Sequence, residues 1–189
     1  ADHYKVVGNN QQWLIYAYIL GFGVPQLFFG PITDKYGRRN LLKLCMVAYV
    51  FFAFLCMFTF SFYFLCLARL FQGVFASGIR VIAISIVRDL TVGRAMARIM
   101  SLVMTVFMII PIIAPLIGQG VMIVAGWKWT FGILGIVGIL VFIWVHYRLP
   151  ETLENSTKGS IGFRHSTNVF FKVLQDPITT GYMISSGFI

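Results

Sequence analysis

The chain has 189 residues, of which 59% are hydrophobic and 11% are charged, and its formal net charge is +9. Soluble globular domains carry charge on about a quarter of their residues. A soluble fold of this length could not hide so much apolar surface from water, so the composition excludes an ordinary soluble enzyme and predicts an all-α membrane protein.

Five apolar runs are long enough to cross a hydrocarbon layer about 30 Å thick, which takes roughly 20 helical residues. In chain order they are residues 13–30, 42–60, 62–87, 99–125 and 131–147, and a sixth run starts at 178 and reaches 189. A transmembrane strand needs only about 10 residues of alternating hydrophobicity, so these runs predict helices.

The basic residues occupy every second polar break between these runs. They form three groups: Arg38, Arg39 and Lys43; Arg88, Arg94 and Arg98; and Arg148, Lys158, Arg164 and Lys172. The breaks around Ser61 and Lys128 carry almost no charge. Since short loops rich in Lys and Arg stay in the cytoplasm, the pattern predicts a multi-pass membrane protein with these three breaks on the cytoplasmic side. The lipid bilayer, and not nucleic acid, is the partner that this alternation indicates.

Nothing in the sequence indicates covalent or metal chemistry. Cys45, Cys56 and Cys66 lie inside apolar runs without the spacing of a metal site. Catalytic Ser/His/Asp sets, metal-ligand clusters and phosphate-binding loops do not stand out either. We therefore expect a protein that is not an enzyme and has no metal or cofactor.

The most specific motif is the segment Gly-Pro-Ile-Thr-Asp-Lys-Tyr-Gly-Arg-Arg at residues 30–39. Gly30 is small enough to let helices approach, Gly37 permits a tight turn, and Arg38 anchors the segment in the cytoplasm. Asp34 offers a carboxylate to a helix end or to an arginine. The segment resembles the signature loop between helices two and three of the major facilitator superfamily, and this predicts a cytoplasmic charge cluster of Asp34, Arg38 and Asp89.

Further segments resemble the same superfamily, and together they cover nearly the whole chain. Residues 67–73 resemble the helix-four motif, and residues 113–118, with Ala114, Pro115 and Gly118, resemble the helix-five motif of antiporters. Residues 87–90, 126–131 and 149–152 resemble segments of the bicyclomycin-resistance-type drug:proton antiporters. Ala114 and Gln119 stand where the helix-five motif usually has glycine, so close helix packing there is expected to differ.

The resemblance implies the amino-terminal six-helix bundle of a twelve-helix transporter, seen from helix two to the start of helix seven. We expect a transmembrane bundle at residues 1–148 that lacks helix one, a cytoplasmic linker at 149–176, and the beginning of helix seven at 177–189. The family works by alternating access, with its substrate near the bilayer midplane, and we expect a monomer. In this reading Gly30, Asp34, Gly37, Arg38 and Asp89 form a conformational gate.

Two arginines inside one predicted helix are the leading candidates for substrate contact. Arg69 and Arg80 are eleven residues apart, so at about 100° per residue both leave the helix on nearly one face. Gly73 and Ala76 between them leave room for a cavity. An intramembrane charge usually faces a bundle interior, although Arg80 could instead snorkel toward headgroups. The candidate substrate-binding residues are Arg69, Gln72, Arg80, Tyr18 and Phe22.

Three functions fit these residues. The first is proton-coupled efflux of small hydrophobic or cationic compounds across the inner (plasma) membrane, as the resemblance implies. The second is transport of an anionic metabolite or siderophore-like compound held by Arg69 and Arg80. The third is a membrane receptor or scaffold that does not transport. No acidic residue falls inside a complete apolar run, so a proton-carrying carboxylate would have to lie elsewhere, unless a group such as His146 carries the proton.

Overall fold

The structure, a computed structural model, describes residues 12–149, without the side chains of Pro31, Asp34 and Lys35. Its helices are α1 (Gln12–Gly23), α2 (Gln26–Tyr36), α3 (Arg38–Phe58), α4 (Phe62–Leu90), α5 (Gly93–Ala125) and α6 (Trp127–Arg148). Within residues 12–149, five helical stretches are apolar and long enough to cross a membrane, with Gln12–Gly30 counted as one span. The predicted all-α membrane class is therefore confirmed.

The first helices begin and end at different residues than the sequence predicts. The segment predicted as a loop at 30–39 is almost entirely helical, because α2 continues to Tyr36 and α3 begins at Arg38. Gly37 alone separates them, with a φ of 87° that other residues rarely adopt. At the first apolar run, the chain instead breaks between α1 and α2 at Pro25. Proline lacks the N–H that would continue the helix, which explains the interruption.

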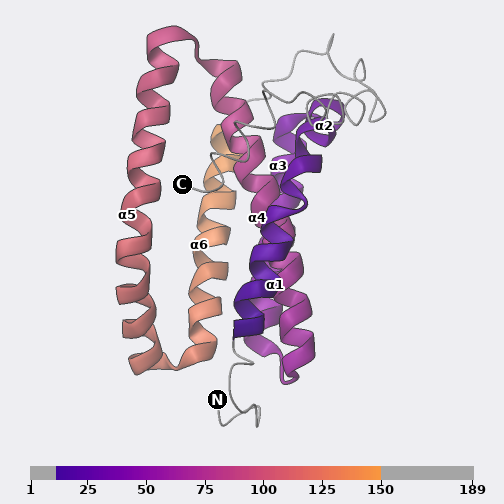
Figure 1. The fold of residues 1–189 in the computed structure, drawn as a ribbon, viewed down its shortest axis with the longest axis vertical. Helices are drawn as coiled ribbons and strands as arrows, with labels where there is room; N and C mark the ends of the chain where they lie inside the picture. The colour runs from indigo at the N-terminus through magenta and orange to yellow at the C-terminus, as the bar shows by residue number, and fades with distance from the viewer. Residues whose placement is uncertain (1–11, 150–189) are drawn as a thin grey trace, which may run out of the picture.

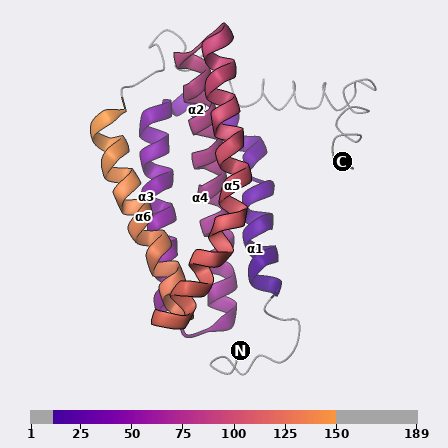
Figure 2. The same cartoon turned by 90° about the vertical axis from the view of Figure 1, so that its left-hand side faces the viewer.

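The bundle is built around α4, which packs along both α1 and α3, while α3 also packs along α6. The two buried clusters follow these contacts. One is centred on Cys45, Met46 and Ile82, and the other on Cys56, Leu65 and Ala68. Figure 1 and Figure 2 show α5 at the margin of the bundle, where it joins α4 at one end and α6 at the other.

Glycines set the closest helix contact. A Cβ atom added to Gly73 of α4 would overlap the carbonyl oxygen of Tyr18 in α1, and one added to Gly21 of α1 would overlap that of Leu70 in α4. The expectation that Gly73 leaves open space is therefore wrong, because the backbone of α1 fills it. Gly30 was expected to permit a close approach, yet no described atom lies within 4 Å of a Cβ added there.

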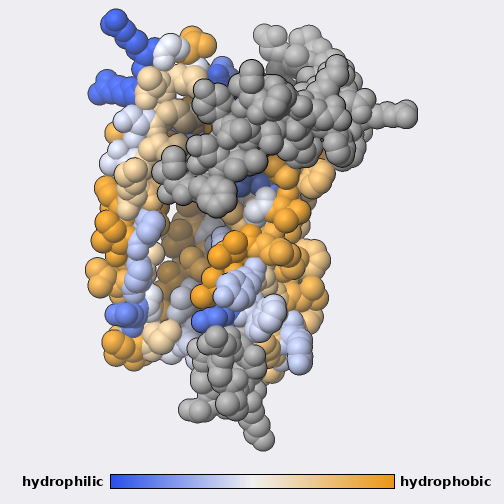
Figure 3. Space-filling view, in the orientation of Figure 1, coloured by the Kyte–Doolittle hydropathy of each residue, from blue (hydrophilic) through white to orange (hydrophobic). Residues whose placement is uncertain are grey.

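One end of the bundle is basic. Arg38 starts α3, Arg88 lies in the last turn of α4, Arg94 lies in the first turn of α5, and Arg148 ends α6, so their helices place them at one end. Figure 3 shows hydrophobic residues over most of this face and hydrophilic ones where α4 turns into α5. Lys128 lies at the other end, beside the start of α6. This separation fits the predicted cytoplasmic side.

Candidate functional site

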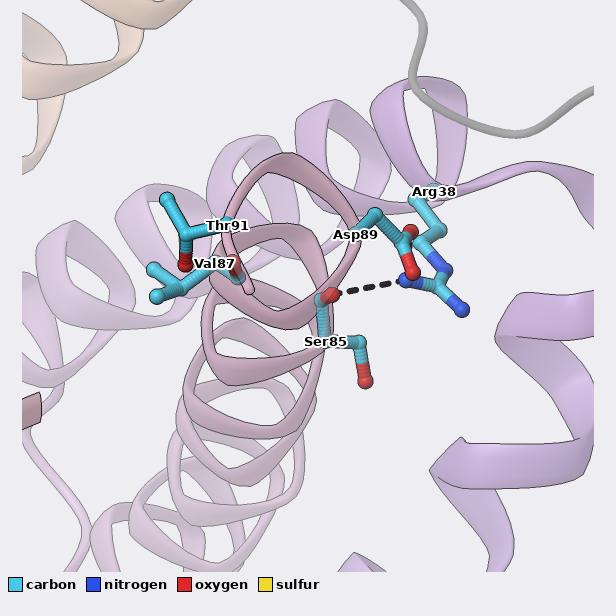
Figure 4. A network of polar contacts seen from close by, with 5 residues as sticks. All are labelled: Arg38, Ser85, Val87, Asp89 and Thr91. Carbon is cyan, nitrogen blue, oxygen red and sulfur yellow. Dashed lines mark hydrogen bonds and ion pairs between the residues drawn. The ribbon is translucent and has the colours of Figure 1, made fainter. Parts of the chain in front are cut away.

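An ion pair ties α3 to α4 at the basic end. The Arg38 guanidinium pairs with the Asp89 carboxylate, and its Nη1 also donates a hydrogen bond of 2.7 Å to the carbonyl oxygen of Ser85 (Figure 4). Their side chains are 13% and 27% exposed, respectively. Gly37 places Arg38 at the start of its helix, within reach of α4. The expected pairing of Arg38 with Asp89 is present, whereas the Asp34 side chain lies outside the described residues.

The geometry explains how Asp89 is tolerated where it stands. A carboxylate in the last turn of a helix is repelled by the partial negative charge of the helix carboxyl end. Arg38 supplies a positive charge to Asp89 and a hydrogen-bond donor to the nearby Ser85 carbonyl. It therefore offsets both the carboxylate charge and the partial negative charge of the helix end. Removing Arg38 would leave both acceptors without this cation.

Arg39 makes a second connection that the sequence analysis missed. Its Nη2 donates a hydrogen bond of 3.2 Å to the backbone oxygen of His146, near the end of α6. Consecutive helical residues point about 100° apart, so adjacent arginines can reach two different helices. The start of α3 is thereby joined to both α4 and α6.

Inside the predicted membrane region, Arg69 is held by side chains of its own chain. Its Nη1 donates a hydrogen bond of 3.1 Å to Oε1 of Gln72, which is fully buried. The carbon at the centre of the guanidinium lies 5.2 Å from the ring centroid of Tyr18 and 4.8 Å from that of Phe131. These are cation–π distances, so α1 and α6 both stabilise the charge of Arg69.

Arg80 lies on the same side of α4 but has different neighbours. Its guanidinium carbon lies 5.7 Å from the ring centroid of Phe22 in α1 and 5.4 Å from that of Phe107 in α5. Tyr18 and Phe22 are themselves stacked, with ring centroids 6.2 Å apart. Arg69, Tyr18, Phe22 and Arg80 therefore form a continuous column of cations and rings between α1 and α4.

Two cavities adjoin this column. One, of about 360 Å³, lies between α1, α4 and α5 and is lined by Arg80, Phe22 and Phe107, but not by Arg69. The other, of about 280 Å³, is lined by Tyr18 of α1 and by residues of α3, α4 and α6, among them Tyr49. Sequence reasoning missed Tyr49, because one polar atom in an apolar helix gives no signal. The two arginines therefore do not line one described cavity.

The helix-five motif residues are not buried against the residues that the structure describes. Ala114 and Pro115 are exposed, and no described atom lies within 4 Å of a Cβ added to Gly118. Their functional role stays a prediction.

The described residues contain no group of three His, Cys, Asp or Glu side chains that could hold a metal ion. The site therefore consists of charges, rings and apolar cavities, which can bind and orient a solute.

Comparison with known proteins agrees with this picture. The chain is 32% identical over 177 residues to an uncharacterized transporter of the major facilitator type from Bacillus subtilis, covering 92% of this chain and 44% of that protein. It is 27% identical to a bicyclomycin resistance protein homolog from Haemophilus influenzae, covering 92% of this chain and 43% of that protein. A riboflavin transporter from Clostridioides difficile is also 27% identical, over 84% of this chain and 35% of its own length.

The chain thus spans less than half the length of these relatives, all of which are named as transporters or as a resistance protein. The sequence pattern of the Major Facilitator Superfamily matches residues 1–189. Together with the five membrane-length spans and the motifs of α2 to α6, this match shows that the chain belongs to the major facilitator superfamily.

Proposed function

We propose that this chain forms the amino-terminal half of a secondary active transporter that moves small organic compounds across the inner (plasma) membrane by alternating access. In this proposal residues 1–148 form the first bundle without its first helix, 149–176 link the two bundles, and 177–189 begin helix seven. All of the last two segments except Leu149 lies outside the described residues. The transporter would work as a monomer.

The observation that carries the proposal is the pair of guanidinium groups on α4. Arg80 comes eight residues, or about 12 Å along the axis, before Arg88 at the basic end. A charge at that depth is costly in a bilayer and marks a substrate or ion pathway by default. A receptor or scaffold that does not transport does not need a charged side chain at this depth. The free-energy cost of burying two guanidinium groups therefore favours transport over that alternative.

The substrate class has two candidates. Proton-coupled efflux of small hydrophobic or cationic compounds is supported by the likeness to a bicyclomycin resistance protein homolog. Transport of an anionic compound is supported by charge, because neither Arg69 nor Arg80 pairs with a carboxylate among the described residues. Two positive charges repel a cation and attract an anion, so the geometry favours the anion.

The Arg38–Asp89 ion pair would act as the conformational gate, with Gly37 as the turn that positions it. It joins the cytoplasmic ends of α3 and α4, and an interaction at partly exposed positions is weak enough to break during each cycle. Asp34 would join this gate. Alternating access requires such a contact to form in one state and to open in the other.

The test is uptake by proteoliposomes that contain the intact transporter, with and without a pH gradient. A screen of hydrophobic cations, neutral drugs and organic anions should find at least one compound whose uptake depends on the protein and is stimulated by the gradient. Uptake at the same rate with and without the pH gradient would exclude proton coupling. The absence of uptake for every class, from protein that folds and reconstitutes, would favour a receptor or scaffold.

A further inference from the structure

The cavity beside Arg80 combines one cation with walls that, among the described residues, carry no other polar side chain. Arg80 is its sole charged lining residue in the part of the chain that the structure describes, and residues such as Ile79, Ala83, Val103 and Phe107 form the rest. Figure 3 shows the surface hollowed between α5 and the α1–α4 pair. Its volume of about 360 Å³ falls in the range of small-molecule sites, roughly 300–1,000 Å³.

The Arg80 guanidinium is available to a ligand. It lies over the rings of Phe22 and Phe107, and cation–π contacts do not use the N–H groups, which point outward in the plane of the guanidinium. Its Nε is buried and has no hydrogen-bond partner among the described residues. An unmade hydrogen bond to a buried charged group is costly, so the site gains free energy when an acceptor arrives.

The Nε of Arg69 is likewise buried without a hydrogen-bond partner among the described residues, but the rest of the Arg69 guanidinium is more occupied than that of Arg80. Its Nη1 already donates to Gln72, and its guanidinium lies between the rings of Tyr18 and Phe131. It rests on Tyr18 while Arg80 rests on Phe22, so the stacked pair of rings lies between the two charges. A small ligand held by Arg80 in its cavity would not reach Arg69.

We propose that the Arg80 cavity binds an amphipathic organic monoanion, whose carboxylate accepts hydrogen bonds from Arg80 and whose apolar body fills the space between α4 and α5. This inference rests on the proposed transport function and names the substrate class for it. Two parallel N–H groups of a guanidinium match the two oxygens of a carboxylate. The apolar walls exclude highly hydrated dianions, because nothing else in the described lining replaces their lost water.

The experiment measures equilibrium binding to the intact transporter in phosphatidylcholine nanodiscs. The probes are 2-naphthoate, the neutral 2-naphthylmethanol and the cationic 2-naphthylmethylamine, which share one apolar body. We expect naphthoate to bind most tightly. The Arg80→Gln variant should weaken naphthoate binding by about 10- to 100-fold and leave the neutral probe nearly unchanged. Arg80→Lys keeps the charge but loses the parallel donors, so its loss should be intermediate.

Two further variants separate binding from folding. Arg94→Gln removes one exposed positive charge from α5 outside the cavity, and we expect naphthoate binding unchanged. Ala83→Leu keeps Arg80 but fills the cavity, so it should weaken all three probes alike. Every variant is first compared with the parent protein by size-exclusion profile and thermal melting.

Naphthoate binding that is equal in the parent and Arg80→Gln proteins would overturn the proposal, as would tighter binding of the naphthylmethylamine. Replacing part of the phosphatidylcholine with phosphatidylglycerol tests a lipid occupant, and loss of naphthoate binding there would assign the site to a lipid headgroup and overturn the proposal too. Uptake is measured separately. Naphthoate binding without any uptake would contradict the proposed function alone, whereas uptake of cations without naphthoate binding would contradict this inference alone.

Discussion

Helices α4 and α5 are both long and apolar, yet they pack very differently against the residues that the structure describes. Gln72, Gly73, Ser77, Gly78 and Ile82 of α4 are buried, whereas α5 has no buried residue. The more apolar of the two helices, α5, is therefore the less buried one. In a membrane, hydropathy measures preference for lipid, and small residues decide which helices can touch.

The largest expected effect comes from a matched pair of glycines. Gly73→Val would push a side chain into the backbone of α1 at Tyr18, so α1 and α4 would have to separate. Overpacking of this kind costs about 1–3 kcal/mol and sometimes more. Gly118→Val in α5 meets no described atom and should change stability by less than about 0.5 kcal/mol. Thermal melting of the two detergent-solubilised variants checks this prediction, and equal losses would break the contrast between the helices.

The second effect concerns the ion pair at the basic end. Arg38→Ala should destabilise the protein by about 1–3 kcal/mol, because it leaves the partly buried Asp89 carboxylate without its cation. Arg98→Ala removes a similar charge from an exposed site on α5 and should change stability little. The swapped double variant, Arg38→Asp with Asp89→Arg, should recover part of the melting temperature. A double variant no more stable than the singles would show that pairing is not the cause.

A smaller effect on stability is expected at the buried side-chain amide of Gln72. Arg69→Met removes the donor to Gln72 Oε1 and should cost about 0.5–1.5 kcal/mol. The double variant Arg69→Met with Gln72→Leu should regain stability, since it no longer buries an unpaired amide. Gln119→Leu, at an exposed position of α5, is the control and should leave the melting temperature within error. A double variant that melts below Arg69→Met would contradict this account.

The smallest effect lies at the hairpin between α5 and α6. The Nζ of Lys128 lies 4.5 Å from the ring centroid of Phe60 and 5.7 Å from that of Trp127. Lys128→Met keeps the apolar stem and removes the cation, so it should cost about 0.5–1 kcal/mol. Raising the salt concentration should not change this difference much. If Lys128→Met destabilised the protein more than Arg38→Ala, the α5–α6 hairpin end would contribute more to helix packing than the basic end, contrary to this prediction.

Much of the fold was predictable because it follows from local chemistry. Run length fixed the number of spans, and the alternation of Arg and Lys fixed which ends lie together. The pairing of Arg38 with Asp89 also followed, because the motifs place both at the same end of neighbouring helices. The loop at 30–39 was mispredicted, since polar residues at a membrane surface are still free to continue a helix.

What the sequence alone determined is therefore the lipid solvent, the helices, which of their ends lie together and which residues carry charge inside the apolar spans. Only the tertiary structure decided what each charge meets. Arg69 and Arg80 share a face of α4, yet one contacts α6 and the other α5, because neighbouring helices approach that face at different heights. Gly73 and Gly30 are the same residue type, yet one is filled by a neighbouring backbone and the other is open among described atoms. Sequence periodicity gives the direction of a side chain, but the distance to the facing helix depends on how the whole bundle packs.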